Sequence, residues 1–255
     1  MSHTAELIAV GTELLLGNIA NTDAQMISEG LSQLGINVYY HTVVGDNPER
    51  VRQAVDIARQ RADILITTGG LGPTCDDLTK VAVAQAFGRT LVYHEPSAQR
   101  IRDRFAAMGR PVTENNFQQA MIPEGATVLD NDWGTAPGVA MEADGIHVLM
   151  LPGPPRECEM MFRHRAVPYL KGLSEGVIVS RTVKTFGIGE SAAEALLRGE
   201  CCRAVGKPGD RDSGRVETGI VREAISITGM GSGGRYLVSQ VKAMRTEIFN
   251  TSLSA

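Results

Sequence analysis

The feature that most constrains the fold is a regular alternation of short apolar runs with helix-like stretches. Residues 5–10, 37–44 and 63–68 form apolar runs of strand length, and 24–34 and 49–61 carry apolar residues at helical spacing. Glycine or polar residues follow each strand. This order predicts right-handed βαβ crossovers and a parallel sheet. The loops after its strands should meet at one edge, where such sheets bind ligands.

Residues with known positional preferences mark the ends of these two helices. Asn21 or Thr22 is expected to cap the first helix, and Gly35 should end it. Pro48 suits the first turn of the second helix, just after the carboxylate of Asp46. Asp46 can be read as a ligand-binding carboxylate or as a residue of a simple Asx-turn.

The third strand leads into the sequence GGLGPTCDD. Gly69, Gly70 and Gly72 allow positive φ and let backbone N–H groups approach a ligand. Asp76 and Asp77 follow, where a helix should begin. Such a loop can hold a phosphate through its amides while the carboxylates hold a divalent cation. Neither a Walker P-loop nor a dinucleotide-binding GxGxxG pattern fits, and a plain turn followed by an N-cap remains the simpler alternative.

The later part of the chain predicts further elements. Helices are expected over 77–87, 96–108, 113–121 and 157–170, strands over 126–129 and 176–185, and a hairpin of 138–143 and 146–151 turning at 144–145. Another helix should open at 187–191. From residue 199 onward the glycine content rises, and only 222–228 and 236–249 have the pattern of regular elements.

Composition excludes several classes of protein. A chain of 255 residues can form one large domain, or a main domain with a smaller one. Its net charge of −4 gives no reason to expect a nucleic-acid partner. No apolar stretch approaches the ~20 residues of a membrane-spanning helix. The N-terminus lacks the basic region of a signal peptide.

The cysteines have neither zinc-site spacing nor the number that a disulfide framework needs: Cys75, Cys158, Cys201 and Cys202. A reducing cytoplasm is therefore the expected compartment. Cys75 lies inside the glycine loop without a basic neighbour, which disfavours a nucleophilic role. Trp133 is interpreted as a packing residue, with lining of the pocket as the alternative.

Five motifs in order resemble the N-terminal domain of the CinA (competence/damage-inducible) family. They are GTELLLG at 11–17, NTD at 21–23, GGLGPTCDDLT at 69–79, GTAPG at 134–138 and LPGPPRE at 151–157. The resemblance covers about residues 4–198. That domain is similar in turn to the molybdopterin-binding domains of molybdenum-cofactor biosynthesis.

The resemblance implies an α/β fold over residues 1–170, with three α/β/α layers and a mostly parallel sheet. A small α+β subdomain should begin at 171–198. Residues 199–255 lack the family's Asn-Pro-Thr-Val-Ala-Pro-Tyr type of motif, as a divergent or frame-shifted terminus would. They are interpreted as an atypical, poorly ordered tail that leaves the subdomain incomplete.

The resemblance also implies a function. Domains of this type are associated with metal-dependent hydrolysis of ADP-ribose, or of a dinucleotide such as FAD. The alternative is a non-hydrolytic module that binds molybdopterin or a nucleotide. The ligand would be a nucleotide or a pterin phosphate, without nucleic-acid or membrane partners, and the chain is expected to form a homo-oligomer. Nicotinamide mononucleotide deamidation belongs to a separate C-terminal domain and is not expected here.

The candidate site residues follow from the motifs together with the resemblance. Mg²⁺, Mn²⁺ or Co²⁺ would be held by Asp46, Asp76 and Asp77, and the candidate catalytic residues are Asp77, Asp76 and Glu157. The candidate ligand-binding residues are Gly11, Glu13, Asn18, Asn21, Gly69, Gly70, Gly72, Thr74, Thr79, Gly153 and Pro154. Glu13 is the alternative to Glu157 as a further metal ligand or as the base that orients water.

Overall fold

The computed structural model describes residues 3–173, 178–186, 224–229 and 238–246. The chain divides into two compact units, one comprising residues 1–32 and 36–174, the other 33–35 and 175–255. No helix among the described residues has both the length and the apolar character needed to cross a bilayer.

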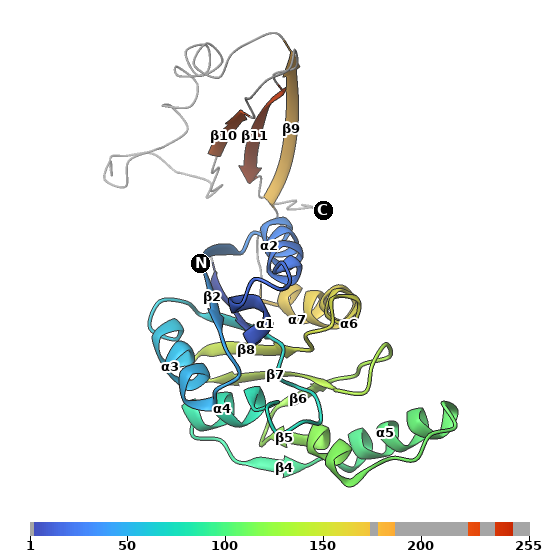
Figure 1. The fold of residues 1–255 in the computed structure, drawn as a ribbon. Coiled ribbons are helices and arrows are strands. Elements are labelled where there is room, and N and C mark those ends of the chain that lie inside the picture. Colours follow the sequence, from blue (N-terminus) through green and yellow to red (C-terminus); the bar gives the residue numbers. More distant parts are fainter. Residues whose placement is uncertain (1–2, 174–177, 187–223, 230–237, 247–255) are drawn as a thin grey trace, which may run out of the picture. The chain divides into compact units, whose positions relative to one another are not determined.

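A six-stranded sheet forms the centre of the first unit, with the strand order β2-β1-β3-β8-β7-β6 (Figure 1). Its strands are β1 (Thr4–Val10), β2 (Asn37–Val44), β3 (Ile64–Thr68), β6 (Thr127–Leu129), β7 (Gly138–Ala143) and β8 (Ile146–Leu151). β1 pairs in parallel with β2 and β3, and β3 pairs in parallel with β8. Only β7 runs antiparallel to its neighbours. The predicted mostly parallel sheet is confirmed.

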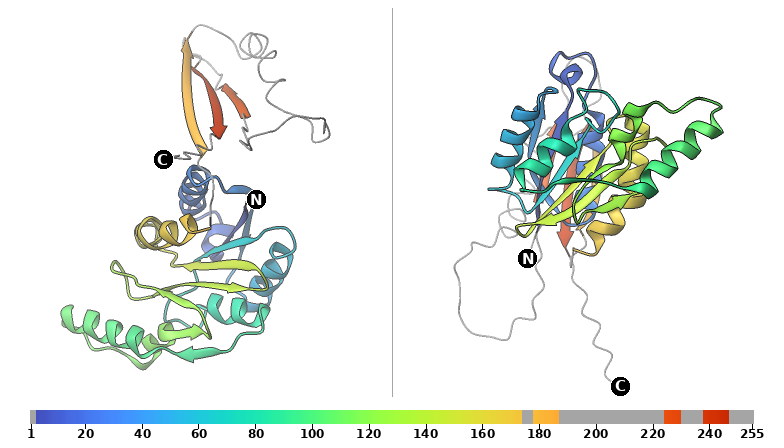
Figure 2. Two further views of the ribbon diagram at one scale, coloured as in Figure 1. Left: turned by 180° about the vertical axis from the view of Figure 1, so that it is seen from behind. Right: turned by 90° about the horizontal axis from the view of Figure 1, so that it is seen from below.

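Helices cover both faces of this sheet (Figures 1 and 2). They are α1 (Thr12–Leu15), α2 (Thr22–Gln33), α3 (Pro48–Ala58), α4 (Thr79–Ala86), α5 (Glu95–Ala107), the 3₁₀-helix η1 (Glu114–Ala120), α6 (Pro155–Met161), the π-helix η2 (Phe162–Ala166) and α7 (Val167–Lys171). The apolar faces of α3 and α4 share one core with β1, β3, β7 and β8. α6 and α7 lie on the opposite face, so the predicted three α/β/α layers are confirmed.

Polar caps, of which Asn21 was predicted, mark where α2 and α3 begin. Asn21 caps α2, because its Oδ1 accepts a hydrogen bond from Ala24 N at 3.1 Å. Asn47 caps α3 in the same way through Arg50 N at 3.0 Å, with Pro48 in the first turn. Gly35 follows α2 with φ of 77°, a conformation that favours glycine at a helix end.

Some local predictions were wrong. The helix expected from residue 77 begins at Thr79, and the helix expected over 113–121 is the 3₁₀-helix η1. The helix expected over 157–170 contains the π-helical turn η2, just before Pro168, which has no N–H to donate to the preceding turn. The short strands β4 (Leu91–Tyr93) and β5 (Met121–Pro123) and the helix α1 were not predicted.

The second unit contains one three-stranded antiparallel sheet in the order β10-β11-β9. Its strands are β9 (Ile178–Phe186), β10 (Ala224–Gly229) and β11 (Val238–Thr246). β9 confirms the strand predicted at 176–185, and β10 and β11 fall on the two stretches where regular elements were expected. The helix expected at 187–191 lies outside the described residues, as does most of 199–255, so the expected disorder of that tail stays a prediction.

Candidate functional site

A cleft of about 610 Å³ opens at the carboxyl ends of the parallel strands, a size typical of small-molecule sites. The loops that follow β1, β2, β3, β6 and β8 contribute to it, together with the 3₁₀-helix η1. Its lining includes Val10, Glu13, Asp46, Gly69, Gly70, Gly72, Thr74, Asp76, Asp77, Gln119, Thr135, Gly153, Pro154 and Glu157. The expectation that loops from separate strands meet at one edge is therefore met, and all four predicted carboxylates of the metal and catalytic sets lie there.

The glycine loop after β3 is packed so closely that side chains do not fit. Gly69 has φ of 89°, and a Cβ at this position would collide with the carbonyl of Val10. Gly70 has φ of 67°, and its Cβ would collide with Thr79 Oγ1. The buried Thr79 hydroxyl donates to Gly69 O at 2.9 Å, and Thr79 N donates to Gly70 O at 3.2 Å. Thr79 thus holds the loop in place through two hydrogen bonds to its backbone carbonyls.

Three backbone donors of this loop are free. Within the described residues, the N–H groups of Gly70, Leu71 and Gly72 donate to no protein acceptor. All three residues line the cleft. Free N–H groups beside successive glycines form the kind of concave donor set that binds anions.

Asp77 closes the turn at the end of the glycine loop. Its Oδ2 accepts hydrogen bonds from Thr74 N at 2.8 Å and Thr74 Oγ1 at 2.6 Å. The carboxylate also lies against Gly72, where a Cβ would approach it to 2.5 Å. Asp77 therefore does not cap α4, whose N-cap is Leu78 and has no side-chain cap. Asp76 is exposed, and its carboxylate has one described contact, the Cys75 thiol at 3.8 Å.

Asp46 joins the loops after β1 and β2. Its Oδ2 accepts from Thr12 N at 2.8 Å, and Thr12 Oγ1 in return accepts from Asp46 N at 3.2 Å. These bonds bridge residues that are far apart in the sequence, unlike the local bond of an Asx-turn. The carboxylate is consequently held at the cleft wall, and its Oδ1 accepts no hydrogen bond from the described residues.

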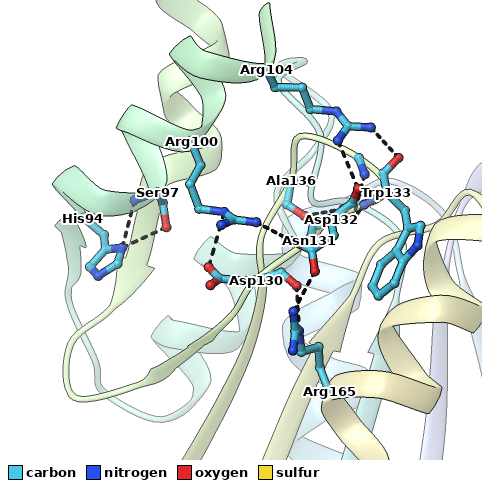
Figure 3. A network of polar contacts seen from close by, with 11 residues as sticks. His94, Ser97, Arg100, Arg104, Asp130, Asn131, Asp132, Trp133, Ala136 and Arg165 are labelled. Atoms are coloured by element: carbon cyan, nitrogen blue, oxygen red, sulfur yellow. Dashed lines mark hydrogen bonds and ion pairs between the residues drawn. The ribbon is translucent and has the colours of Figure 1, made fainter. Parts of the chain in front are cut away.

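Glu157 lies where the first turn of α6 meets the loop before β7. Its Oε2 accepts a hydrogen bond from Asn131 Nδ2 at 2.9 Å. Asn131 also donates to Ala136 O at 2.9 Å and accepts from the backbone N–H groups of Trp133 and Gly134 (Figure 3). A Cβ on Gly134 would collide with the Glu157 carboxylate. The buried Asn131, which the sequence reading missed, thus positions Glu157. Its place just before the GTAPG motif was the available signal.

The carboxylates fit a hard divalent cation by their chemistry but do not converge in a complete ligand set. Among the described residues, no group of three or more His, Cys, Asp or Glu side chains is placed to hold a metal ion. Asp46 and Asp77 each use one carboxylate oxygen on protein donors. Mg²⁺ is commonly bound by one or two carboxylates with ligand phosphate oxygens and water completing its shell. A cation here would need oxygens from the bound ligand.

The remaining predicted residues lie in different places. Glu13 lines the cleft, and its carboxylate lies over the buried Gly11. Gly153 packs against Gly69, where a Cβ would approach Cα to 3.1 Å. Asn21 caps α2 and lines a small adjoining cavity of about 40 Å³. Asn18 is exposed and is absent from the linings of the cleft and of this cavity.

The small cavity is also lined by Asp23 of the NTD motif, which was not among the predicted site residues. Asp23 is half-buried, and burial raises its pKa to about 6, although a hydrogen bond from the Cys158 thiol opposes the rise. Burial and the Asp23 charge raise the pKa of the Cys158 thiol, which therefore stays protonated. Cys75 and Cys158 are both free thiols.

The 3₁₀-helix η1 braces the glycine loop from the other side. Asn115 donates to Pro73 O at 3.3 Å, and Gln118 Nε2 donates to Thr74 O at 3.3 Å and Asp77 O at 3.4 Å. The buried ammonium group of Lys80 donates to Gln119 O at 2.6 Å. Burial lowers the pKa of Lys80 to about 8, against the opposing effect of the Asp77 charge.

A second pocket of about 370 Å³ lies between α5 and the loop 130–137 (Figure 3). Here arginines and aspartates pair with one another. Arg100 binds Asp132 at 2.5 Å and Asp130 at 3.5 Å, and Arg165 binds Asp132 at 2.7 Å. Arg104 donates to the carbonyls of the loop. The Trp133 ring stacks on His164 with ring centroids 5.4 Å apart, which supports its interpretation as a packing residue.

Comparisons with known proteins agree with this geometry. The model of a family described as "Probable molybdopterin binding domain" matches residues 6–172. A CinA-like protein of Dictyoglomus turgidum is 53% identical over 193 residues, which cover 76% of this chain and 47% of that protein. A CinA-like protein of Dictyoglomus thermophilum is 52% identical over 193 residues, with the same coverage. The chain thus spans about half the length of the curated relatives it matches.

A solved structure is also similar. The crystal structure of the protein CinA from Thermoplasma acidophilum, whose function is unknown, superposes with a TM-score of 0.59 and 32% sequence identity. The superposition covers 64% of this chain and 95% of that one.

Proposed function

This chain belongs to the molybdopterin-binding domain family as a CinA-like member, and from that premise we propose that its cleft binds a small molecule through a phosphate group. The ligand class is a nucleotide or a pterin phosphate. The observation that carries the proposal is the set of free N–H groups of Gly70, Leu71 and Gly72 on the cleft wall. Amides of this kind bind phosphate oxygens without a charged side chain.

The charge of the cleft supports a phosphate with a cation rather than a bare anion. Within the described part of the chain, its lining carries the carboxylates of Glu13, Asp46, Asp76, Asp77 and Glu157 and contains no Lys, Arg or His. A dianionic phosphate placed among them would be repelled at close range. The free amides offset part of that repulsion, and Mg²⁺, Mn²⁺ or Co²⁺ held by one or two of the carboxylates, Asp76 among them, together with the phosphate oxygens would offset the rest.

A second candidate function is metal-dependent hydrolysis of a phosphoanhydride such as ADP-ribose or FAD. The observation that favours it is the gathering of these carboxylates around the amides that would hold a phosphate. When bound, the cation would neutralise charge on the phosphate oxygens and activate water. Glu157, oriented by Asn131 at 2.9 Å, would accept the water proton. Breaking the P–O–P bridge of ADP-ribose with water would yield AMP and ribose 5-phosphate.

One experiment separates binding from hydrolysis. The full chain is incubated with ADP-ribose, FAD or NAD in the presence of each metal, and AMP release is measured beside equilibrium binding of AMP. Hydrolysis predicts release that Asp77→Ala abolishes, whereas a binding module predicts AMP binding without release. Full release by Asp77→Ala would contradict the hydrolytic assignment. Absence of both binding and release would contradict the proposed function itself.

Assembly and compartment complete the proposal. We place the chain in the cytoplasm as a homo-oligomer, because its family resemblance implies self-association. Light scattering coupled to size exclusion should report a mass above the 27.3 kDa of one chain. A third class of function, an interaction protein that acts as an oligomer, would predict that variants of the acidic loop keep partner binding after they lose all ligand affinity.

A further inference from the structure

One side chain of the cleft has a buried polar atom without a partner. Gln119, in η1, is 2% exposed and lines the cleft. Its Oε1 is buried and has no hydrogen-bond partner among the residues that the structure describes. A buried acceptor without a donor costs free energy of folding, so nearly all such atoms in native proteins are paired. A donor from a bound molecule would remove this cost.

The backbone around Gln119 is held by hydrogen bonds. Disorder of this segment therefore does not explain why the side-chain oxygen is unpaired. Lys80 Nζ donates to Gln119 O at 2.6 Å, and His94 N donates to Ala120 O at 2.9 Å. The neighbouring Gln118 uses its own side-chain amide on the glycine loop. The two adjacent side-chain amides of η1 therefore differ. That of Gln118 holds the glycine loop, whereas that of Gln119 lies at the cleft without a protein partner among the described residues.

The chemistry of the amide defines its ligand. A glutamine amide offers one acceptor and a donor group side by side in one plane. Its complement is an exocyclic amino group next to a ring nitrogen, as when glutamine or asparagine reads the N6 and N7 edge of adenine. Aminopurines such as adenine share this amino-substituted edge with pterins. A heterocycle without the amino group would leave the Gln119 oxygen unpaired.

We propose that Gln119 is a specificity-determining residue that recognises the amino-substituted edge of the ligand's nitrogen heterocycle. This inference rests on the proposed function, since the same ligand would place its phosphate on the amides of Gly70, Leu71 and Gly72. The cleft would then read both ends of the molecule, one through backbone donors after β3 and the other through η1. Recognition at Gln119 involves no charged group, in contrast to the carboxylate-lined end.

The test is calorimetric titration of the full chain, with Mn²⁺ present, by four probes. These are inorganic phosphate, AMP, purine riboside 5′-monophosphate, which lacks the amino group, and the phosphate ester of 6-hydroxymethylpterin. The wild type should bind AMP or the pterin ester about tenfold or more tightly than purine riboside 5′-monophosphate. Whichever amino-bearing probe binds more tightly identifies the source of the heterocycle.

Variants assign this discrimination to one side chain. Gln119→Met should remove it while leaving inorganic phosphate binding unchanged, and Gln119→Glu, which keeps an acceptor, should retain part of it. Gln118→Met is the matched control: it should weaken all four probes alike, because it loosens the glycine loop. Thermal unfolding verifies that each variant is folded.

Each outcome decides the proposal. Equal discrimination by wild type and Gln119→Met would overturn the role of Gln119 and leave the phosphate site standing. So would phosphate binding by a wild type that binds neither AMP nor the pterin ester more tightly than purine riboside 5′-monophosphate, since an ordered water would then satisfy the Gln119 oxygen. If none of the four probes binds, the proposed function fails and the inference fails with it.

Discussion

The two pockets on either side of Thr135 differ in what their polar groups do. Thr135 lines both. In the cleft after β3, backbone donors, the Gln119 oxygen and several carboxylate oxygens have no protein partner among the described residues. In the pocket under α5, Arg100 and Arg104 are bound to aspartates or loop carbonyls, and Arg165 binds Asp132 of the pocket lining from η2. A concentration of charge therefore does not identify a ligand site; polar groups left unpaired do.

The ion pairs of the pocket under α5 also help to position a residue of the cleft. Asp132 joins Arg100 of α5 to Arg165 of η2, and this junction holds the loop that carries Asn131 (Figure 3). Asn131 in turn positions Glu157 at the cleft. Because these ion pairs are half-exposed, each contributes only about 0–1 kcal/mol to folding stability. Their contribution is geometric more than energetic.

The largest expected effect comes from the glycine loop. Gly70→Ala should lower the free energy of unfolding by about 2–5 kcal/mol and abolish phosphate binding, because the new Cβ is strained at positive φ and collides with Thr79 Oγ1. Gly88→Ala is the matched control, since Gly88 has φ of 61° and no atom of the described residues lies within 4 Å of its Cβ position. It should cost about 1–2 kcal/mol and leave binding intact. Urea unfolding measures the stability of each variant, and phosphate titration measures its binding. Equal losses in Gly70→Ala and Gly88→Ala would contradict the special role of the glycine loop.

The next effect concerns the buried charge beside the cleft. Lys80 forms no salt bridge among the described residues, and its folded pKa of about 8 lies below the unfolded value near 10.5. Between these values the unfolded chain binds more protons, so stability should rise as the pH increases from 8 to 10.5, by at most about 3 kcal/mol. Lys80→Met should lack this rise. Urea unfolding at several pH values tests it, and parallel curves for both proteins would refute it.

A smaller effect separates the carboxylates of the two pockets. Asp76→Ala should weaken Mn²⁺-dependent AMP binding by at least about tenfold, because Asp76 is proposed to hold the cation. Its stability should stay within about 0.5 kcal/mol of the wild type, since the side chain is exposed and, among the described residues, bonds to the Cys75 thiol alone. Asp103→Ala, which removes an exposed carboxylate of the other pocket, should change neither quantity. Unchanged AMP binding by Asp76→Ala would contradict the proposed cation ligand.

The smallest effect lies in the arginine network. Asp132→Asn should lower the free energy of unfolding by about 1 kcal/mol or less, because it weakens ion pairs that are half-exposed to solvent. AMP affinity should change less than about threefold, equivalent to less than 1 kcal/mol. A large loss of AMP binding at full stability would instead place the ligand in the pocket under α5.

The alternation of strands and helices was readable from sequence because each element carries its own signal. Apolar runs predicted β1, β2 and β3, and polar caps such as Asn21 and Asn47 fix where the following helices begin. β4 and β5 were missed because three-residue strands have too little periodicity to stand out. The π-helical turn η2 was missed since one additional residue in a turn barely disturbs helical spacing.

The candidate site was predictable only for residues that belong to loops after strands. The glycines and carboxylates of the cleft had this placement. Lys80 and Gln119 lie in helices, and Asn131, which follows β6, does not line the cleft. All three were missed because their roles depend on contacts with η1, with the cleft and with Glu157 that form only when distant segments pack. Asp77 shows the converse: its place before a helix suggested a cap, yet its carboxylate bonds back to Thr74.

The most direct test of the central claim is a titration of the ¹⁵N-labelled full chain with AMP and Mg²⁺, followed by amide NMR. If the cleft binds phosphate through the glycine loop, the amide signals of Gly70, Leu71 and Gly72 shift saturably, while the side-chain Nε signals of Arg100, Arg104 and Arg165 stay in place. Saturable shifts of those arginine signals with unmoved glycine amides would contradict the account.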